Sequence, residues 1–104
     1  MPVQLDAESL AEVRKILDFH VPALKVWVFG SRATETAKRF SDLDIALEGD
    51  EPIAYETISK LKHAFSESDL PMRVDVVDWN SLDEEFKEAI AAQRVPLFDD
   101  AAVH

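Results

Sequence analysis

The 104-residue sequence contains no cysteine, only two glycines and no long apolar run. Without cysteine the chain has no disulfide framework, no thiolate nucleophile and no cysteine-based zinc site. Its apolar runs stay well short of the roughly 20 residues that a membrane-spanning helix needs, and its first residues lack the basic start and apolar stretch of a signal peptide. We therefore expect a cytoplasmic protein that makes no contact with a membrane.

Basic residues are also scarce, with 11 lysines and arginines against 21 aspartates and glutamates and a formal net charge of −10 at pH 7. This charge is spread along the chain, so we expect the protein to repel nucleic acid rather than to bind it directly. A template-directed polymerase or a tRNA-modifying enzyme would need a basic groove, and this function therefore ranks last. A small anion that is held by a metal cation is compatible with the charge.

The order of apolar patterns predicts an α+β (mixed α/β) fold, in which a small mixed sheet of three to four strands is flanked by about four helices. A hydrophobic content of 47% supports one compact core, and we expect a single domain across residues 1–104. Helical spacing predicts helices over residues 6–20, 31–38 and 53–66 and a last one that begins after Ser81. Short β-branched or alternating runs predict strands over residues 24–29, 41–48, 72–77 and 95–98, with the first central and the last at an edge.

Three of these helices begin with capping signals. Asp6 is the expected N-cap of the first helix and Ser31 that of the second, while Ser81 and Glu84 have the spacing of a capping box before the last helix. The apolar residues of the last helix are expected to form its buried stripe, which consists of Leu82, Phe86, Ala89 and Ile90.

The predicted strand over residues 41–48 has an acidic side. Its apolar residues point one way, whereas Asp42 and Asp44 point the other way and lie about 6.6 Å apart. Asp75 is a third acid within a strand, between two valines. Unpaired carboxylates in such places are costly unless they protonate or meet a cation. Oxygen ligands of this kind suit Mg²⁺, so we expect the three acids to hold one or two ions, although an Asp-x-Asp pair alone is more often a solvated strand end.

Gly30 and Ser31 form a predicted turn between a buried strand and a helix start, where backbone N–H groups, the helix dipole and a hydroxyl can bind a phosphate. Because glycine is used so sparingly, its position here indicates a backbone conformation that a side chain would obstruct. Lys38 and Arg39 are within reach of a triphosphate, but solvated surface charge is the more common role. Together the acids and the turn predict nucleotidyl transfer from ATP or another nucleoside triphosphate.

The chain resembles the minimal members of the polymerase-beta-like nucleotidyltransferase superfamily. The resemblance rests on VFGSRA at residues 28–33, SDLDI at 41–45 and RVDVV at 73–77, with the glycine-to-aspartate spacing of that family. VPLF at residues 95–98 looks like the closing strand of the family, so the resemblance covers almost the whole chain. The sequence departs from the pattern at Thr34 and Glu35, where the family often has arginine and glycine, and this predicts weaker nucleotide binding.

The resemblance implies roles for six residues. Three of them would bind the nucleotide, namely Gly30, Ser31 and Arg32. Three would be catalytic metal ligands, namely Asp42, Asp44 and Asp75. Minimal members are commonly encoded beside a helical HEPN-type protein and act as its antitoxin, some by transferring AMP to the toxin. The resemblance therefore implies a Mg²⁺-dependent transfer of AMP from ATP to a hydroxyl of such a partner, within a hetero-complex.

A function without catalysis is the alternative. In that case the chain is a binding module that neutralises its helical partner by contact alone, and the acids serve nucleotide sensing or are a relic. A domain of this size leaves its cleft open on one side, so we expect either a homo-oligomer or a hetero-complex.

Overall fold

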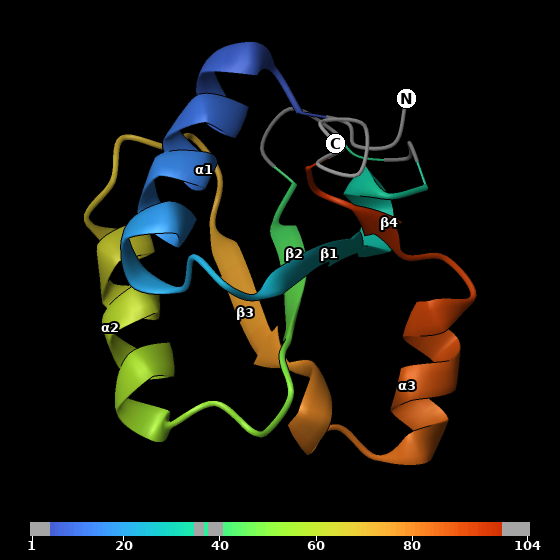
Figure 1. The fold of residues 1–104 in the computed structure, drawn as a ribbon. Coiled ribbons are helices and arrows are strands. Elements are labelled where there is room, and N and C mark those ends of the chain that lie inside the picture. The colour runs from blue at the N-terminus through green and yellow to red at the C-terminus, as the bar shows by residue number, and fades with distance from the viewer. Residues whose placement is uncertain (1–4, 35–36, 38–40, 99–104) are drawn as a thin grey trace, which may run out of the picture.

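The structure is a computed structural model that describes residues 5–34, 37 and 41–98. Within these ranges the chain forms three α-helices, four strands and two 3-10 turns, and the helices lie on both sides of one sheet (Figure 1). The helices are α1 (Ala7–His20), α2 (Tyr55–Ser66) and α3 (Glu84–Ala91). The strands are β1 (Lys25–Phe29), β2 (Leu43–Glu48), β3 (Val74–Asp78) and β4 (Val95–Pro96). The 3-10 turns are η1 (Gly30–Arg32) and η2 (Trp79–Ser81).

The predicted mixed α+β architecture is confirmed. The strand order is β3-β2-β1-β4, so the first strand lies inside the sheet and the last lies at an edge, as predicted. β1 is antiparallel to both β2 and β4, whereas β2 and β3 are parallel. Parallel neighbours need a crossover connection, which α2 supplies between β2 and β3.

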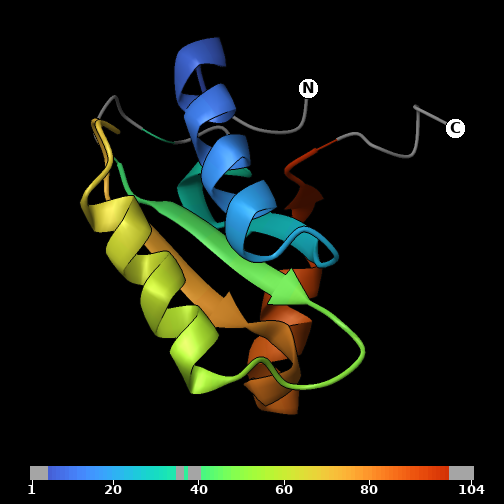
Figure 2. The ribbon, with the colours of Figure 1, turned by 60° about the vertical axis from the view of Figure 1, so that its left-hand side comes forward.

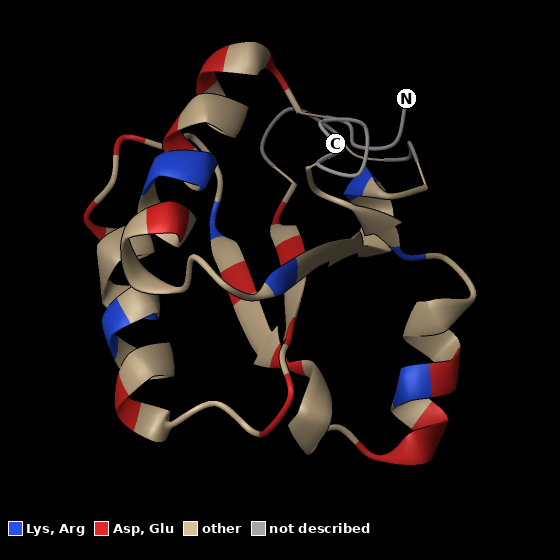
Figure 3. Ribbon diagram, viewed as in Figure 1, with Lys and Arg blue, Asp and Glu red and all other residues tan. Residues whose placement is uncertain are grey.

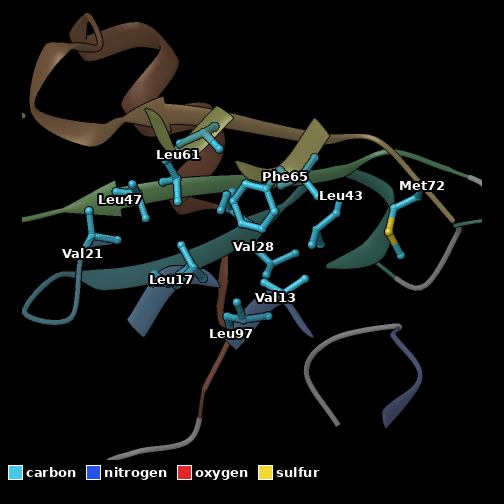
Figure 4. Packing of buried hydrophobic residues seen from close by; sticks show 14 residues of the cluster. Val13, Leu17, Val21, Val28, Leu43, Leu47, Leu61, Phe65, Met72 and Leu97 are labelled. Carbon is cyan, nitrogen blue, oxygen red and sulfur yellow. The ribbon is translucent and has the colours of Figure 1, made fainter. Parts of the chain in front are cut away.

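Side-chain alternation gives this sheet two unlike faces. The first, which we call the apolar face, is formed by Val26, Val28, Leu43, Ile45, Leu47, Val74 and Val76, all of them buried. α1 and α2 lie side by side over this face (Figure 2). Val13 and Leu17 from α1 pack onto it together with Leu61 and Phe65 from α2 (Figure 4). Each such side chain contributes about 1.5–3 kcal/mol when it is fully buried, so this layer stabilises the fold.

The opposite side, which we call the acidic face, carries the register partners Phe29, Asp44 and Asp75, followed along the strands by Trp27, Ala46 and Val77. α3 lies on this side, and its Phe86 meets Phe29 edge-on with 6.4 Å between the ring centroids. Among the described residues no helix has the length and apolar character to cross a bilayer.

The described residues contain fewer helices than the roughly four that the sequence predicts. The predicted helix over residues 31–38 lies partly outside the described residues; where the structure describes it, the chain after β1 forms the 3-10 turn η1, whose N-cap position is Phe29 rather than Ser31. Gly30, with a φ of +76°, begins this turn directly at the end of β1. Lys38 and Arg39 lie outside the described residues.

Two of the three predicted caps can be compared with α-helix starts. Asp6 caps α1 as predicted and accepts a hydrogen bond of 2.7 Å from the Ser9 N–H. For α3 the prediction was wrong, because Asp83 is the N-cap and accepts from the Phe86 N–H at 2.8 Å, whereas Ser81 lies within η2. A carboxylate directly before the first turn satisfies a free N–H and also interacts favourably with the helix dipole.

The predicted buried stripe of α3 is also only partly right. Ile90 is 1% exposed, but Phe86 is 44% exposed and Ala89 is exposed as well. Leu82 precedes the helix and is half-buried. This short helix lies over the face of the sheet that carries polar and charged residues, so it has less apolar surface to cover than α1 or α2.

Candidate active site

Two of the three predicted acids lie opposite each other on neighbouring strands. Asp44 of β2 is the register partner of Asp75 of β3 in the parallel pair. Neighbouring strands lie about 4.8 Å apart, and residues in register point to the same face of the sheet. Both carboxyl groups therefore rise from the acidic face, and Figure 3 shows acidic positions side by side on these two strands.

Asp42 and Arg73 extend this arrangement by one more pair. Each precedes its strand by one residue, and the Leu43 N–H donates to the Arg73 carbonyl at 2.8 Å. Because residues two apart on an extended chain point to the same side, Asp42 aligns with Asp44, and Arg73 aligns with Asp75. We call these four residues the carboxylate square, in which three corners are acids and the fourth is a guanidinium.

Arg73 attracts two of the three carboxylates. Its Nη2 donates to Oδ2 of Asp42 at 3.2 Å, and its Nε lies 3.8 Å from Oδ1 of Asp75. The hydrogen bond to Asp42 and the charges of Asp42 and Asp75 raise the pKa of Arg73. In the part of the chain that the structure describes, no three acidic or histidine side chains are gathered in the manner of a metal site. The strands thus bring the three acids together, while the side chains of two of them face Arg73.

Asp44 is an acid of the square whose pKa is shifted. Burial is the main cause that raises its pKa from 3.8 to about 6, and the charges of Asp75 and Asp42 act in the same direction. Arg73 opposes this effect but does not cancel it. A perturbed carboxyl among like charges is typical of a site that binds a cation or handles a proton.

Gly30 follows β1 directly and adopts a conformation that favours glycine. Its φ is +76°, in the left-handed region, and a Cβ at this position would lie 2.5 Å from Oδ2 of Asp44. The pairing of Phe29 with Asp44 across β1 and β2 causes this close approach. The Gly30 N–H donates to Oε1 of Gln93, in the loop after α3, at 2.8 Å. The predicted glycine turn and the acidic strand therefore meet at Asp44.

Ser31 and Arg32, which the resemblance also assigns to the nucleotide, have different surroundings. Ser31 is half-buried in η1 next to Gly30. Arg32 is only 5% exposed, and its Nε and Nη2 donate to the Ser41 carbonyl at 3.1 and 2.9 Å. This contact ties η1 to the residue before Asp42. In this conformation Arg32 supports the backbone of the site through Nε and Nη2.

Thr34 stands where the family often has arginine. Its hydroxyl, which has a single proton to donate, lies 3.3 and 3.4 Å from the carbonyl oxygens of Gly30 and Ser31 and so contacts the turn from within. Glu35, the second departure from the family pattern, lies outside the described residues.

Neither Arg73 nor Gln93 is among the site residues that the sequence predicts. Arg73 could have been found, because its position two residues before Asp75 predicts that both side chains lie on one face. Gln93 has no comparable signal, since 63 residues separate it from Gly30.

A mixed sheet with strand acids in register beside a glycine turn is the arrangement of a nucleotidyltransferase. The family model described as polymerase beta, nucleotidyltransferase, matches residues 11–102, and the chain belongs to this family. A more specific relative is the probable protein adenylyltransferase MntA of Haemophilus influenzae. It is 51% identical over 89 residues, which cover 84% of this chain and 78% of MntA.

Solved structures share the same fold. A chain in the crystal structure of a toxin–antitoxin with AMP-PNP is 27% identical, with a TM-score of 0.72, over 86% of this chain and 72% of that chain. A chain in the structure of a tri-AMPylated Shewanella oneidensis HEPN toxin in complex with MNT antitoxin has a TM-score of 0.65. That second match covers 92% of this chain and 76% of the other at 22% identity, and it shows the common fold alone.

Proposed function

We propose that this chain is a Mg²⁺-dependent protein adenylyltransferase of the cytoplasm, which transfers AMP from ATP to a hydroxyl of a helical HEPN-type toxin and so acts as its antitoxin. The observation that carries the proposal is the meeting of Gly30 and Asp44, with Asp75 in register beside them. The name of the MntA relative supports the reaction. The toxin–antitoxin neighbour with AMP-PNP supports both the nucleotide and the kind of partner.

The proposed roles follow from the surroundings of each residue. Gly30 and Ser31 form the turn, in which the Ser31 N–H and hydroxyl would bind phosphate oxygens while the Gly30 N–H donates to Gln93. In the reaction the acceptor oxygen bonds to the α-phosphorus of ATP, the bond to the β-phosphate breaks, and pyrophosphate leaves. We assign the proton of the acceptor hydroxyl to Asp75, because its side chain is 49% exposed and within reach of a protein acceptor. Asp44 lies closer to the turn, beneath Gly30.

The residues of the carboxylate square fit a divalent cation. Asp42, Asp44 and Asp75 offer the oxygen ligands that Mg²⁺ prefers, and a side chain at position 30 would take the space beside Asp44. When bound, one or two Mg²⁺ ions would neutralise the triphosphate and polarise its α-phosphorus. A cation would also relieve the repulsion among the three acids that contributes to the raised pKa of Asp44.

Transfer of label from α-labelled ATP to the purified toxin, in the presence of Mg²⁺, tests this proposal. The double variant Asp42→Asn/Asp44→Asn should lower the labelling by at least about a hundredfold, as expected when a main electrostatic element of an active site is lost. The matched control is Asp50→Asn/Glu51→Gln, which removes two charges from the exposed turn after β2 and should label the toxin normally. Full labelling by the Asn variant would contradict the proposal.

Neutralisation by contact alone is the second candidate, and one observation favours it. Arg73 pairs with Asp42 and Asp75, so two of the three acids have a cationic partner within the chain. If this function is correct, the Asp42→Asn/Asp44→Asn variant should form the complex and protect cells from the toxin as well as the unchanged chain does. Loss of protection together with loss of labelling would exclude it.

A further inference from the structure

The fourth corner of the carboxylate square is a cation of the chain itself. We propose that the Arg73 guanidinium is a built-in counter-ion, which pairs with Asp42 and Asp75 while metal is absent and competes with the divalent cation for them. Arg73 would then set the affinity of the site for metal. This inference rests on the proposed function, because it takes the same three acids as the metal ligands.

The backbone holds Arg73 where its guanidinium competes with a divalent cation for Asp42 and Asp75. The hydrogen bond from the Leu43 N–H to the Arg73 carbonyl fixes the start of β3 beside the start of β2. Asp42 then lies across from Arg73, and Asp75 follows it by two residues on the same side of the strand. A guanidinium presents several N–H donors in one plane, so it can reach both acids at once.

The contacts occupy oxygens that a metal ion would use. Oδ2 of Asp42 accepts a hydrogen bond of 3.2 Å from Arg73, and Oδ1 of Asp75 lies 3.8 Å from its Nε. Mg²⁺ takes oxygen ligands at about 2.0–2.1 Å, and two cations cannot share these carboxylates at such distances without strong repulsion. The guanidinium therefore opposes binding of the ion at these carboxylates.

The same contacts are weak enough to be displaced. The Arg73 side chain is 74% exposed, and those of Asp42 and Asp75 are 40% and 49% exposed. Ion pairs at such exposure are screened by water and salt, so they lower the affinity for a divalent cation by a modest factor and do not exclude it. Arg73 would thus offset part of the negative charge of Asp42 and Asp75 while the metal is absent.

Titration with Mn²⁺ in the absence of nucleotide, with the free ion measured by electron paramagnetic resonance, tests the inference. Arg73→Gln should bind Mn²⁺ about threefold to tenfold more tightly than the unchanged chain, which is the range expected when exposed ion pairs are removed. Arg73→Lys keeps the charge but loses the planar fork, so its affinity should fall between the two. The matched control is Arg14→Gln, which removes an arginine paired with Asp18 at 3.7 Å on α1 and should change the affinity less than twofold.

A second measurement does not depend on counting bound metal. The rise in unfolding temperature that Mn²⁺ causes should be larger in Arg73→Gln than in the unchanged chain or in Arg14→Gln, because tighter binding to the folded state stabilises it more. Equal affinities in Arg73→Gln and Arg14→Gln would overturn the inference, and so would weaker binding in Arg73→Gln.

The failure of the inference can be told apart from that of the proposed function. If the unchanged chain binds Mn²⁺ and Asp42→Asn/Asp44→Asn does not, the acids are the metal site whatever Arg73→Gln does, and only the inference is at stake. If the unchanged chain binds no Mn²⁺ either with or without ATP, both proposals fall.

Discussion

The two faces of the sheet are made by alternate residues of the same strands, yet one face packs the core and the other carries the candidate site. On β2, Leu43 and Ile45 are fully buried beneath α1 and α2, while Asp44 between them is a half-buried carboxyl with a raised pKa. The apolar face gathers side chains that gain from leaving water, and the acidic face gathers like charges that do not. The residues that stabilise the fold and those proposed for the chemistry therefore lie on opposite faces of the same sheet.

The largest effect is expected from a cavity in the apolar face. Leu17→Ala should destabilise the domain by about 2–5 kcal/mol, because Leu17 is 1% exposed and its neighbours cannot close the gap. Urea unfolding measures this loss, and Leu82→Ala, at a half-buried position outside this layer, is the control with a smaller expected cost. Mn²⁺ affinity of the folded variant should stay within twofold. A marked loss of affinity would show that the two faces are coupled.

The next effect is expected at the turn that bounds the acidic face. Gly30→Ala should lower AMP transfer on the order of a hundredfold, because a misplaced group in an active site costs about that much. Its φ of +76° disfavours alanine, and the new Cβ would meet Asp44 at 2.5 Å. Steady-state labelling of the toxin measures the loss.

The other glycine of the chain is a matched control for this variant. A Cβ at Gly49 would meet the far end of the Leu24 side chain, which can rotate away. Gly49→Ala should therefore label the toxin nearly as well as the unchanged chain. Equal losses in both variants would mean that the turn at Gly30 has no special role.

The acidic face should also respond to pH in two opposite ways. The pKa of Asp44 is about 6 in the folded chain, above its ordinary 3.8, so the folded state holds this proton more tightly than the unfolded state. The resulting stabilisation of the metal-free domain is complete below about pH 3.8 and is lost as the pH rises through about 6. Metal binding needs the carboxylate, so Mn²⁺ affinity should fall by up to about tenfold for each pH unit below about 6.

Thermal unfolding with and without Mn²⁺, from about pH 4 to about pH 8, measures both trends. Asp44→Asn cannot titrate at this position, so it should lose this contribution to the pH dependence of the metal-free domain. If Mn²⁺ affinity instead fell only below about pH 4, the carboxyl of Asp44 would have an ordinary pKa.

The elements that bury alternate or periodic residues could be predicted from the sequence. Apolar patterns predicted α1, α2 and the four strands, with the first inside the sheet and the last at an edge, because burial determines which residues of these elements are apolar. The alternation of Asp42 with Asp44 predicted a shared side of β2 for the same reason. The position of Arg32 was not predictable in this way, since its burial depends on a carbonyl at Ser41 that only the folded loop presents. The prediction of the α3 cap was wrong because Ser81 and Asp83 both fit the local rules for an N-cap. Ser81 lies within η2, so the helix begins after Asp83.

The contact between Gln93 and Gly30 joins the loop after α3 to the glycine turn, and it gives the smallest predicted effect. A hydrogen bond of 2.8 Å at an exposed site is worth about 0.5–1.5 kcal/mol, so Gln93→Ala should raise the KM for ATP by about threefold to tenfold. kcat should change less, because the carboxylate square is untouched. Glu88→Ala, at an exposed position on α3, is the control and should leave both constants unchanged. A lower KM in Gln93→Ala would contradict the positioning role of Gln93. The Gln93 side chain would then compete with phosphate for the Gly30 N–H.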